Sequence, residues 1–242
     1  MRETIYAIGD IHGQHELLLD ALALIELDGG QEAKVISLGD LVDRGPDSRA
    51  VIETLREGIA QGRNWQVLMG NHDRLFEQFL RSGVITHPKM RPSYTWLSPE
   101  LGGRDTLASY GVDVTLAAEA LRAAALEAVP DDHRAFLAGL PLYAEAGDCL
   151  FVHAGVQPGL PMAWQSEEDL IWIRDAFLTH DAPFERLVIH GHTAVLAPEH
   201  RGNRVNIDSG AGFGRALTVV AIEGTDVFVL EEDGRKRLTP QG

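Results

Sequence analysis

Five short segments of the sequence combine glycine with side chains that can bind metal ions, and each comes at the end of an apolar run. Aspartate, histidine and asparagine supply the donor atoms in these segments, which contain no cysteine. Taken singly, an aspartate after a glycine is often only a helix cap or a turn residue. Five such segments are harder to explain in that way, so we expect them to form one site. The segments are Gly9–Gly13, Gly39–Gly45, Gly70–Asp73, Val152–Gly155 and His190–Thr193.

The donor types indicate which cations this site would take. Carboxylate, imidazole and amide donors without thiolates suit Mn²⁺, Fe or Zn²⁺. Two carboxylates, an amide and several imidazoles are also more than a single ion needs. We therefore expect two divalent metal ions that share a carboxylate, with Mn²⁺ as the expected ion and Fe or Zn²⁺ as the alternatives.

The surrounding elements predict how these segments meet. In the first third of the chain, short β-branched runs alternate with helical periodicity, which is typical of βαβ units and a largely parallel sheet. Open α/β sheets bind ligands beyond the carboxyl ends of their strands, and glycine lets the chain turn sharply there. The first three segments should therefore converge at one edge of a sheet. The expected strands are 4–8, 34–38 and 65–69, and the expected helices lie near 18–25, 52–59 and 72–82.

The rest of the chain is organised differently. Residues 85–113 hold three prolines and a Gly-Gly pair, which predicts an irregular excursion that carries Tyr94 and Trp96, either as a lid over the site or packed on a local core. An Ala/Leu-rich helix follows around Leu121–Ala128, and another helix is expected near 167–174. The remaining segments predict strands at 142–146, 149–152, 187–190, 205–208, 217–222 and 227–230, with an antiparallel hairpin at the turn 223–226.

Composition places the chain among ordinary globular proteins. Its 242 residues, 45% of them hydrophobic, fit one large α/β domain. The single Cys149 excludes an internal disulfide, and we expect it to be a small buried apolar residue.

Charge and targeting patterns limit the expected partners and location. A net charge of −15 weighs against extended nucleic acid and anionic membranes as partners. The longest basic run, 235–237, is expected to be a solvated tail. The sequence has no signal-peptide pattern and no apolar run near the ~18 residues of a membrane span, so the expected location is cytoplasmic.

The ordered motifs GDIHG, GDLVDRG, GNHD, VHAG and GHT resemble those of the calcineurin-like metallophosphoesterases, and within that family the bacterial and phage branch of phosphoprotein phosphatases. The resemblance covers residues 9–193, in the same order and with similar spacing. It implies an α/β fold in which two mixed β-sheets pack as a sandwich flanked by helices, in four layers αββα. It also implies a single metallophosphoesterase domain over residues 1–242, with an irregular and helical excursion at about 85–140.

The resemblance further implies a role for each matching residue. Asp10 and His12 would hold the first metal ion, and Asp40 would bridge to the second. His190, which precedes the glycine of the last motif, is expected to be structural or to support a ligand. The second ion would be completed by Asn71, His153 and His192.

The expected reaction is in-line attack on phosphorus by a hydroxide that bridges the two metal ions. His72 would protonate the leaving oxygen as general acid, and Asp43 would fix the tautomer of that histidine. Arg44 is expected to bind phosphate oxygens in a bidentate manner, and Arg174 is a second phosphate-binding candidate. The structural alternatives are that Arg44 pairs with Asp47 and that Arg174 is an exposed helix residue.

These features predict a phosphomonoester hydrolase, first of all a serine/threonine or dual-specificity protein phosphatase. The main alternative is a symmetrical diadenosine tetraphosphate hydrolase or a related nucleotide pyrophosphohydrolase. Members of that branch typically carry GDLVARG, so Asp43 favours the phosphatase, whereas the His-Ala-Gly at 153–155 is found in the hydrolase branch and in some bacterial phosphatases.

Two further alternatives carry less weight. Many phosphodiesterases of the superfamily have a histidine where this chain has Ala194, which weighs against a cyclic-nucleotide or nucleic-acid diesterase. A catalytically silent binding module would have lost a ligand, and all expected ligands are present.

Overall fold

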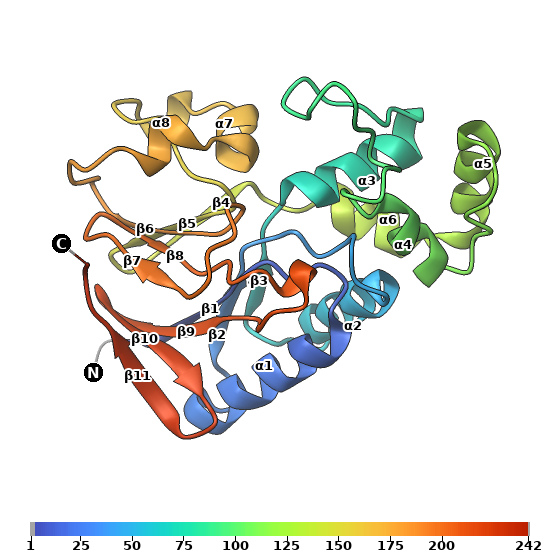
Figure 1. Cartoon of the computed structure of the whole chain (residues 1–242). Helices are drawn as coiled ribbons and strands as arrows, with labels where there is room; N and C mark the ends of the chain where they lie inside the picture. The colour runs from blue at the N-terminus through green and yellow to red at the C-terminus, as the bar shows by residue number, and fades with distance from the viewer. Residues whose placement is uncertain (1–2, 242) are drawn as a thin grey trace.

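Two β-sheets pack face to face and carry helices on their outer sides (Figure 1). The structure, a computed structural model, describes residues 3–241. Sheet A has the strand order β11-β10-β9-β1-β2-β3, and sheet B has the order β4-β5-β6-β8-β7. Both sheets combine parallel with antiparallel pairs, so the predicted fold of two mixed sheets flanked by helices is confirmed.

The strands are short. Of the strands that precede the motifs, β1, β2, β5 and β6 lie inside their sheets, and β3 lies at the edge of sheet A. The strands of sheet A are β1 (Ile5–Ile8), β2 (Lys34–Ser37), β3 (Trp65–Val67), β9 (Val219–Glu223), β10 (Asp226–Glu231) and β11 (Gly234–Leu238). The strands of sheet B are β4 (Tyr143–Ala146), β5 (Cys149–Val152), β6 (Leu187–His190), β7 (Glu199–His200) and β8 (Arg204–Asn206). The predicted hairpin joins β9 to β10 as an antiparallel pair.

The helices form the two outer layers and the excursion. They are α1 (His15–Gly29), α2 (Ser48–Ala60), α3 (Asn71–Ser82), α4 (Gly103–Ser109), α5 (Ala118–Ala128), α6 (Asp131–Ala138), α7 (Glu167–Trp172) and α8 (Asp175–Leu178), with single 3₁₀ turns η1 (Met162–Trp164) and η2 (Ala211–Phe213). Within residues 3–241, none of these helices combines the length and the apolar character that crossing a lipid bilayer requires.

The layers are held together by three groups of buried apolar side chains. Successive side chains of a strand point to opposite faces. In β1, Ile8 packs toward the helices that cover sheet A, whereas Ala7 packs into the space between the two sheets. In β5, Phe151 lies between the sheets, whereas Val152 packs with Phe177 under the helices on sheet B. Because both faces of these strands are buried, their sequences are continuous apolar runs. Cys149 is fully buried and free, as expected.

The prediction of a solvated tail at 235–237 is wrong. These residues form most of β11, which pairs antiparallel with β10 at the edge of sheet A. The guanidinium of Arg235 donates hydrogen bonds to Asp28 of α1 and to Glu223 of β9. An edge strand with charged side chains exposes one row of its backbone groups, and the charges protect that edge from pairing with other chains. The basic run is therefore an edge strand.

The segment with Trp96 packs on a local core, which is the second of the two alternatives expected for it. Residues 85–140 contain α4, α5 and α6; α5 and α6 pack against α3, and α4 packs against α2. The Trp96 side chain is fully buried, and its indole ring lies against Phe76 and Phe79 of α3, with ring centroids 5.5 and 4.8 Å away. The alternative, in which this aromatic residue packs on a local core, is correct because the apolar face of α3 needs cover.

Candidate active site

The motif side chains meet at one end of the sandwich, beyond the carboxyl ends of five strands. Two of these side chains follow β1, and one follows β2. Two lie in the first turn of α3, after β3, and one side chain each follows β5 and β6. The side chains are all buried: Asp10, His12, Asp40, Asn71, His72, His153 and His192. The structure therefore places all six predicted metal-binding residues, together with the predicted general acid, in one cluster.

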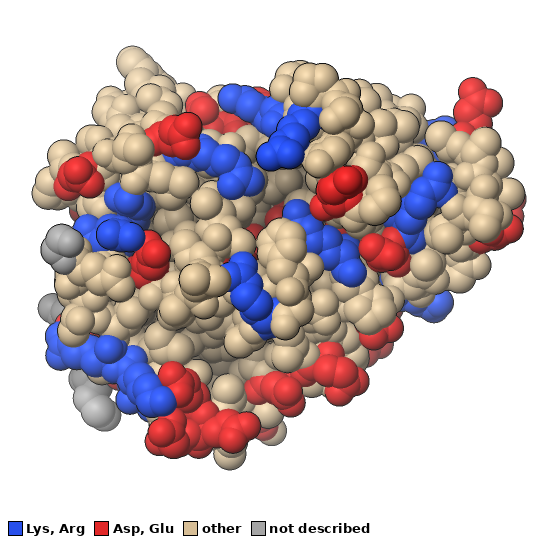
Figure 2. Space-filling model, in the orientation of Figure 1, with Lys and Arg blue, Asp and Glu red and all other residues tan. Residues whose placement is uncertain are grey.

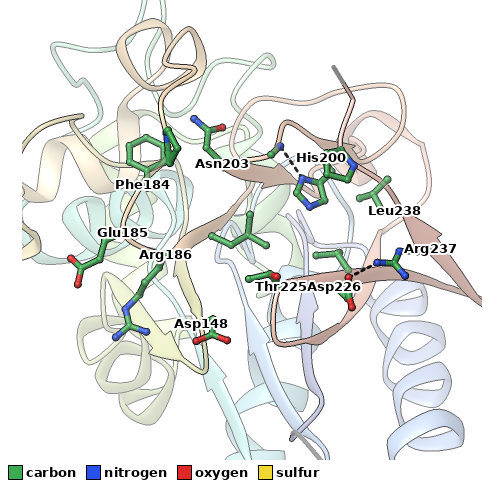
Figure 3. A pocket seen from close by; sticks show the side chains of 15 residues that line it. Asp148, Phe184, Glu185, Arg186, His200, Asn203, Thr225, Asp226, Arg237 and Leu238 are labelled. Atoms are coloured by element: carbon green, nitrogen blue, oxygen red, sulfur yellow. Dashed lines mark hydrogen bonds and ion pairs between the residues drawn. The ribbon is translucent and has the colours of Figure 1, made fainter.

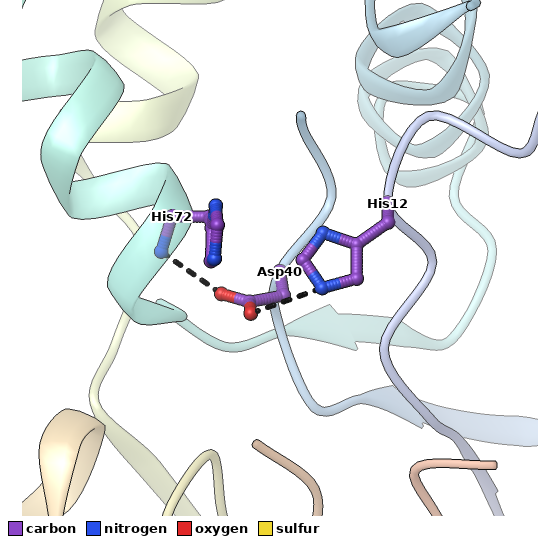
Figure 4. A group of neighbouring side chains, drawn as sticks. All are labelled: His12, Asp40 and His72. Carbon is purple, nitrogen blue, oxygen red and sulfur yellow. Dashed lines mark hydrogen bonds and ion pairs between the residues drawn. The ribbon is translucent and has the colours of Figure 1, made fainter. Parts of the chain in front are cut away.

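Asp40 lies at the centre of this cluster (Figure 4). Its Oδ2 lies 3.4 Å from the Nε2 of His12, and its Oδ1 lies 3.4 Å from the Nε2 of His153. The backbone N–H of His72 donates a hydrogen bond to the same Oδ1 at 3.0 Å. Two groups of three potential metal ligands contain Asp40, one with His12 and His72 and the other with Asp10 and His153. A carboxylate common to two groups can be shared by two cations.

The imidazoles are oriented as metal ligands by hydrogen bonds to the backbone. The Nδ1–H of His12 donates to the carbonyl of Val42 at 2.9 Å, and that of His153 donates to the carbonyl of Leu38 at 3.0 Å. Each ring therefore directs the lone pair of Nε2 toward the carboxylate of Asp40. A lone pair and a carboxylate oxygen repel each other, and a cation between them removes the repulsion.

The electrostatics of the cluster also fit a cation. Burial lowers the pKa values of His12, His153 and His192 and so favours the neutral, ligand-competent form. Burial likewise raises the pKa of Asp10 well above its ordinary range, and the charges of Asp208 and Asp40 add to this effect. For Asp40, burial alone would raise the pKa, but the neighbouring imidazoles outweigh it and hold the pKa low.

Two polar atoms of the cluster are buried without a hydrogen-bond partner within the described residues, namely Oδ1 of Asp10 and Nε2 of His192. Both belong to residues that the motifs predict as metal ligands. A buried polar atom without a partner costs free energy unless an ion or another group satisfies it. The residues present therefore fit two divalent cations.

Backbone strain is concentrated in this cluster. Within residues 3–241, five residues other than glycine have a positive φ: His12, Asp40, Asp43, Arg44 and His192. Such conformations cost on the order of 1–3 kcal/mol each and persist where the surrounding structure enforces them, often at functional sites. All five residues lie in the predicted motifs. Their strained backbone conformations lower the stability of the fold and direct these side chains into the cluster.

Two motif glycines leave room for the carboxylates. A Cβ on Gly191 would lie 2.0 Å from the Oδ1 of Asp10, and a Cβ on Gly70 would lie 2.2 Å from the Oδ1 of Asp40. Any side chain at these positions would collide with the carboxylate beside it. Glycine is therefore required here for close approach.

The two predicted arginines both reach the cluster. The guanidinium of Arg44 contacts the Nε2 of His12 at 2.5 Å and that of His72 at 3.0 Å, and it lies over the ring of Phe213. Arg174 lies between α7 and α8 and donates to the Oγ1 of Thr193 at 2.9 Å. Both guanidinium groups therefore lie beside the cluster.

His72 and Asp43 form a buried pair next to the potential ligands. The Nδ1–H of His72 donates to the Oδ2 of Asp43 at 2.6 Å, which leaves its Nε2 facing Arg44. His190 is buried, with Nδ1 3.1 Å from the carbonyl oxygen of Gly191, and lies outside both groups of potential ligands among the described residues.

Sequence reasoning missed four residues that shape the site. The carboxylate of Asp73 accepts hydrogen bonds from the backbone N–H groups of Gly70 and Leu41, which joins the second motif to the start of α3. An acidic residue three positions after a helix N-cap is a known capping pattern, so this residue could have been found. The second residue is Asp208, and burial raises its pKa to about 6. The other two are Trp96 and Thr106, which donate hydrogen bonds to the carboxylate of Asp43.

The surface around the cluster is basic although the chain as a whole is acidic. Figure 2 shows Lys and Arg side chains on several sides of a central hollow between α7 and α3, while Asp and Glu gather along the lower edge. A hollow of about 390 Å³ adjoins the cluster, and Lys89, Trp172 and Arg174 are among the residues that line it. This face can attract a substrate with several negative charges.

A second hollow, of about 610 Å³, lies at the opposite ends of β5 and β6 (Figure 3). Two of its charged side chains, Arg237 and Asp226, pair with each other, and the backbone N–H of Gly202 donates to the Nδ1 of His200. Among the described residues that line it, none belongs to the five motifs. The chemistry is therefore assigned to the cluster around Asp40.

Comparison with known proteins agrees with this geometry. A family model described as calcineurin-like phosphoesterase matches residues 3–213. The chain is 33% identical to a symmetrical bis(5'-nucleosyl)-tetraphosphatase of an Acidovorax species, over 70% of this chain and 48% of that protein. It is 28% identical to the asymmetrical bis(5'-nucleosyl)-tetraphosphatase PrpE of Anoxybacillus flavithermus, over 88% of each chain. It thus spans about half of the first relative and most of the second.

Two further similarities complete the comparison. The chain is 27% identical to serine/threonine-protein phosphatase 1 of Salmonella typhimurium, over 90% of this chain and 92% of that protein. A solved structure of a cold-active protein-tyrosine phosphatase from a Shewanella species superposes with a TM-score of 0.66 at 14% identity, covering 99% of this chain and 81% of the other, which shows a shared fold. With the family match over most of its length, the chain belongs to the calcineurin-like phosphoesterases, metal-dependent hydrolases of phosphate esters.

Proposed function

We propose that this enzyme hydrolyses dinucleoside polyphosphates, using two divalent metal ions bound at the cluster around Asp40. Asp10 and His12 would hold one ion, and Asp40 would be shared by both. The other ligands of the second ion would be Asn71, His153 and His192. The presence of Asp40 in both groups of potential ligands supports two ions that share it, and within the described residues Oδ1 of Asp10 and Nε2 of His192 are buried without a partner. The groups pair Asp10 with His153 and His12 with His72, so the division of ligands between the ions rests on the motif resemblance. Mn²⁺ is the first ion to test because the donors are carboxylate, imidazole and amide.

The side chains around the ions divide the remaining tasks. When bound, the ions supply positive charge that activates water and offsets the negative charge developing on the phosphate. Arg44 and Arg174 bind phosphate oxygens through their guanidinium groups. The oxygen of water forms a bond to phosphorus, one proton of that water passes to solvent, and the bond from phosphorus to the leaving oxygen breaks. His72, held by Asp43 at Nδ1, would give a proton from Nε2 to that leaving oxygen.

The hollow beside Arg174 supports a polyphosphate substrate. It adjoins the metal-binding residues because Arg174, which lines it, donates to Thr193, directly after His192. The hollow is lined by two cationic side chains, Arg174 and Lys89, and by one acidic side chain, Asp169. A chain of phosphates continues past the reacting group with a negative charge on each unit, and this arrangement can bind those charges. The two tetraphosphatase relatives support the same substrate class.

A protein phosphatase is the second candidate function. Asp43 stands where the symmetrical hydrolases that the motifs resemble typically have alanine, and in this structure its carboxylate holds His72. The similarity to the Salmonella phosphatase extends over nearly the full length of both chains. Both observations favour a site that can protonate the poor leaving group of a phosphoserine.

The two candidates are separated by one comparison of substrates. The manganese-loaded enzyme is offered diadenosine tetraphosphate and phosphoserine, phosphothreonine and phosphotyrosine peptides, and the kcat/KM values are compared. We expect diadenosine tetraphosphate to exceed every peptide by at least about tenfold, which corresponds to about 1.4 kcal/mol of differential transition-state stabilisation. A preference for a peptide would overturn the first candidate in favour of the second. The products, two ADP or AMP with ATP, show which phosphate reacts.

Replacing Lys89 by glutamine is expected to raise the KM for diadenosine tetraphosphate about tenfold, because the variant loses one charge-assisted contact to the phosphate chain. Hydrolysis of p-nitrophenyl phosphate, which has no further phosphates, should change less than about twofold. Lys236→Gln is the matched control, because Lys236 lies on β11 and pairs with Glu231. An equal effect of the Lys89 variant on both substrates would remove the hollow from the substrate-binding site.

A further inference from the structure

The carboxylate of Asp43 is fully buried and accepts hydrogen bonds at both oxygens. Its Oδ2 accepts from the Nδ1–H of His72 at 2.6 Å and from the indole Nε1–H of Trp96 at 2.8 Å. Its Oδ1 accepts from the hydroxyl of Thr106 at 2.6 Å. The same hydroxyl oxygen accepts from the backbone N–H of Asp43 at 2.8 Å. Thr106 therefore forms hydrogen bonds with both the side chain and the main chain of Asp43.

These two donors come from the excursion, far along the chain from the residue that they hold. Trp96 precedes α4, and Thr106 lies within it. The indole of Trp96 also packs on Phe76 and Phe79 of α3, the helix whose first turn carries His72. One side chain thus contacts both the helix that carries His72 and the carboxylate that pairs with it.

Asp43 needs such support for two physical reasons. Its φ is +73°, in a region that residues other than glycine adopt only where the surroundings enforce it. Its carboxylate is removed from water, and a buried carboxylate is costly unless several donors compensate for the lost hydration. Thr106 donates to Oδ1, and Trp96 donates to Oδ2 beside His72. The carboxylate therefore cannot rotate away from His72 without breaking these hydrogen bonds.

We propose that Trp96 and Thr106 are positioning residues that hold the carboxylate of Asp43 against the Nδ1 of His72. The excursion thereby acts as a brace for the proton-donating pair. This inference rests on the proposed role of His72 as the proton donor to the leaving group. Neither residue touches the substrate or the metal-binding atoms in this account, so both act through Asp43.

The test uses substitutions that remove one donor and keep the shape. Thr106→Val deletes the hydroxyl at nearly constant volume, and Trp96→Phe deletes the indole N–H while keeping an aromatic ring. Thr106→Ser retains a hydroxyl and is the rescue variant. Tyr110→Phe is the matched control, because it removes a buried hydroxyl near the end of α4 that pairs with His133 and not with Asp43.

The first readout needs no turnover. In proton NMR of the metal-free protein, the Nδ1 proton of His72 should give a strongly downfield signal because it lies in a short hydrogen bond to a carboxylate. We expect the signal to move upfield or vanish by exchange in Thr106→Val and Trp96→Phe, and to stay in place in Thr106→Ser and Tyr110→Phe. An unchanged signal in both of the first two variants would overturn the inference.

The second readout is the dependence of kcat on the leaving group, measured on the manganese-loaded enzyme. For Thr106→Val and Trp96→Phe, we expect kcat on a phosphoserine peptide to fall about tenfold and kcat on p-nitrophenyl phosphate to fall less than about twofold, because the aryl leaving group needs less protonation. KM should not change. An equal loss on both substrates, or the same pattern in Tyr110→Phe, would mean a general structural effect.

The two readouts also separate this inference from the proposed function. If the wild-type enzyme does not hydrolyse diadenosine tetraphosphate, the proposed function fails, while the NMR signal still tests whether Trp96 and Thr106 hold the pair. If the wild-type enzyme is active and the variants change neither the signal nor the leaving-group dependence, the proposed function stands and the brace is refuted.

Discussion

Asp40→Asn is expected to abolish turnover and to weaken metal binding by more than about a hundredfold. The carboxylate of Asp40 belongs to both groups of potential ligands, and an amide is a poor neutral donor that cannot balance two cations. The variant should still fold, because the amide oxygen can accept the hydrogen bond from the backbone N–H of His72. Metal content after dialysis and kcat on diadenosine tetraphosphate measure the two effects.

The exposed Asp20 of α1 provides the control for this substitution. Asp20→Asn makes the same chemical change far from the cluster and should leave metal content and turnover as in the wild type. If Asp40→Asn keeps two metal ions per chain and its activity, Asp40 does not bridge. If it loses one ion and keeps the other, the carboxylate serves a single site and the shared role is wrong.

His72→Asn is expected to lower kcat about a hundredfold on a phosphoserine peptide, in the range of a general acid in other enzymes. The metal content should stay near that of the wild type, because the Nδ1 of His72 is engaged by Asp43 and its Nε2 faces Arg44. On p-nitrophenyl phosphate, the loss should be less than about tenfold, since its leaving group needs little protonation.

The alternative for His72 is that it binds a metal ion, because it lies close enough to His12 and Asp40 to be a ligand. In that case His72→Asn would lose an ion, and activity would fall equally on alkyl and aryl substrates. His15→Asn is the control, because the ring of His15 contacts Thr54 on α2, away from the cluster. Metal analysis and the ratio of the two kcat values therefore distinguish a proton donor from a ligand.

The parts of the fold that follow local patterns could be predicted from the sequence. The strand at 5–8 is a continuous apolar run because both of its faces are buried, and the strands at 34–37 and 65–67 keep apolar residues at Val35, Ile36 and Val67. Such runs are visible without any partner. Each strand is followed, one to three residues later, by a glycine and then a polar side chain. Because the carboxyl ends of parallel strands lie at one edge, the approach of Asp10, Asp40 and Asn71 followed from these runs.

The parts that depend on distant partners could not be predicted in this way. β7 has two residues, and β11 reads Gly-Arg-Lys-Arg-Leu, so neither shows an apolar pattern, and each exists because a neighbouring strand offers its hydrogen bonds. The donors Trp96 and Thr106 lie 53 and 63 residues from Asp43, on a segment without periodicity. The positive φ at Asp43 is likewise enforced by tertiary contacts.

The central claim is that Asp40 lies between two cations. Crystals of the enzyme soaked in manganese and measured at the manganese absorption edge test it most directly. The account predicts two anomalous peaks, both within bonding distance of the carboxylate of Asp40, one beside His12 and the other beside His153. A single peak, or two peaks of which only one contacts Asp40, would contradict the claim.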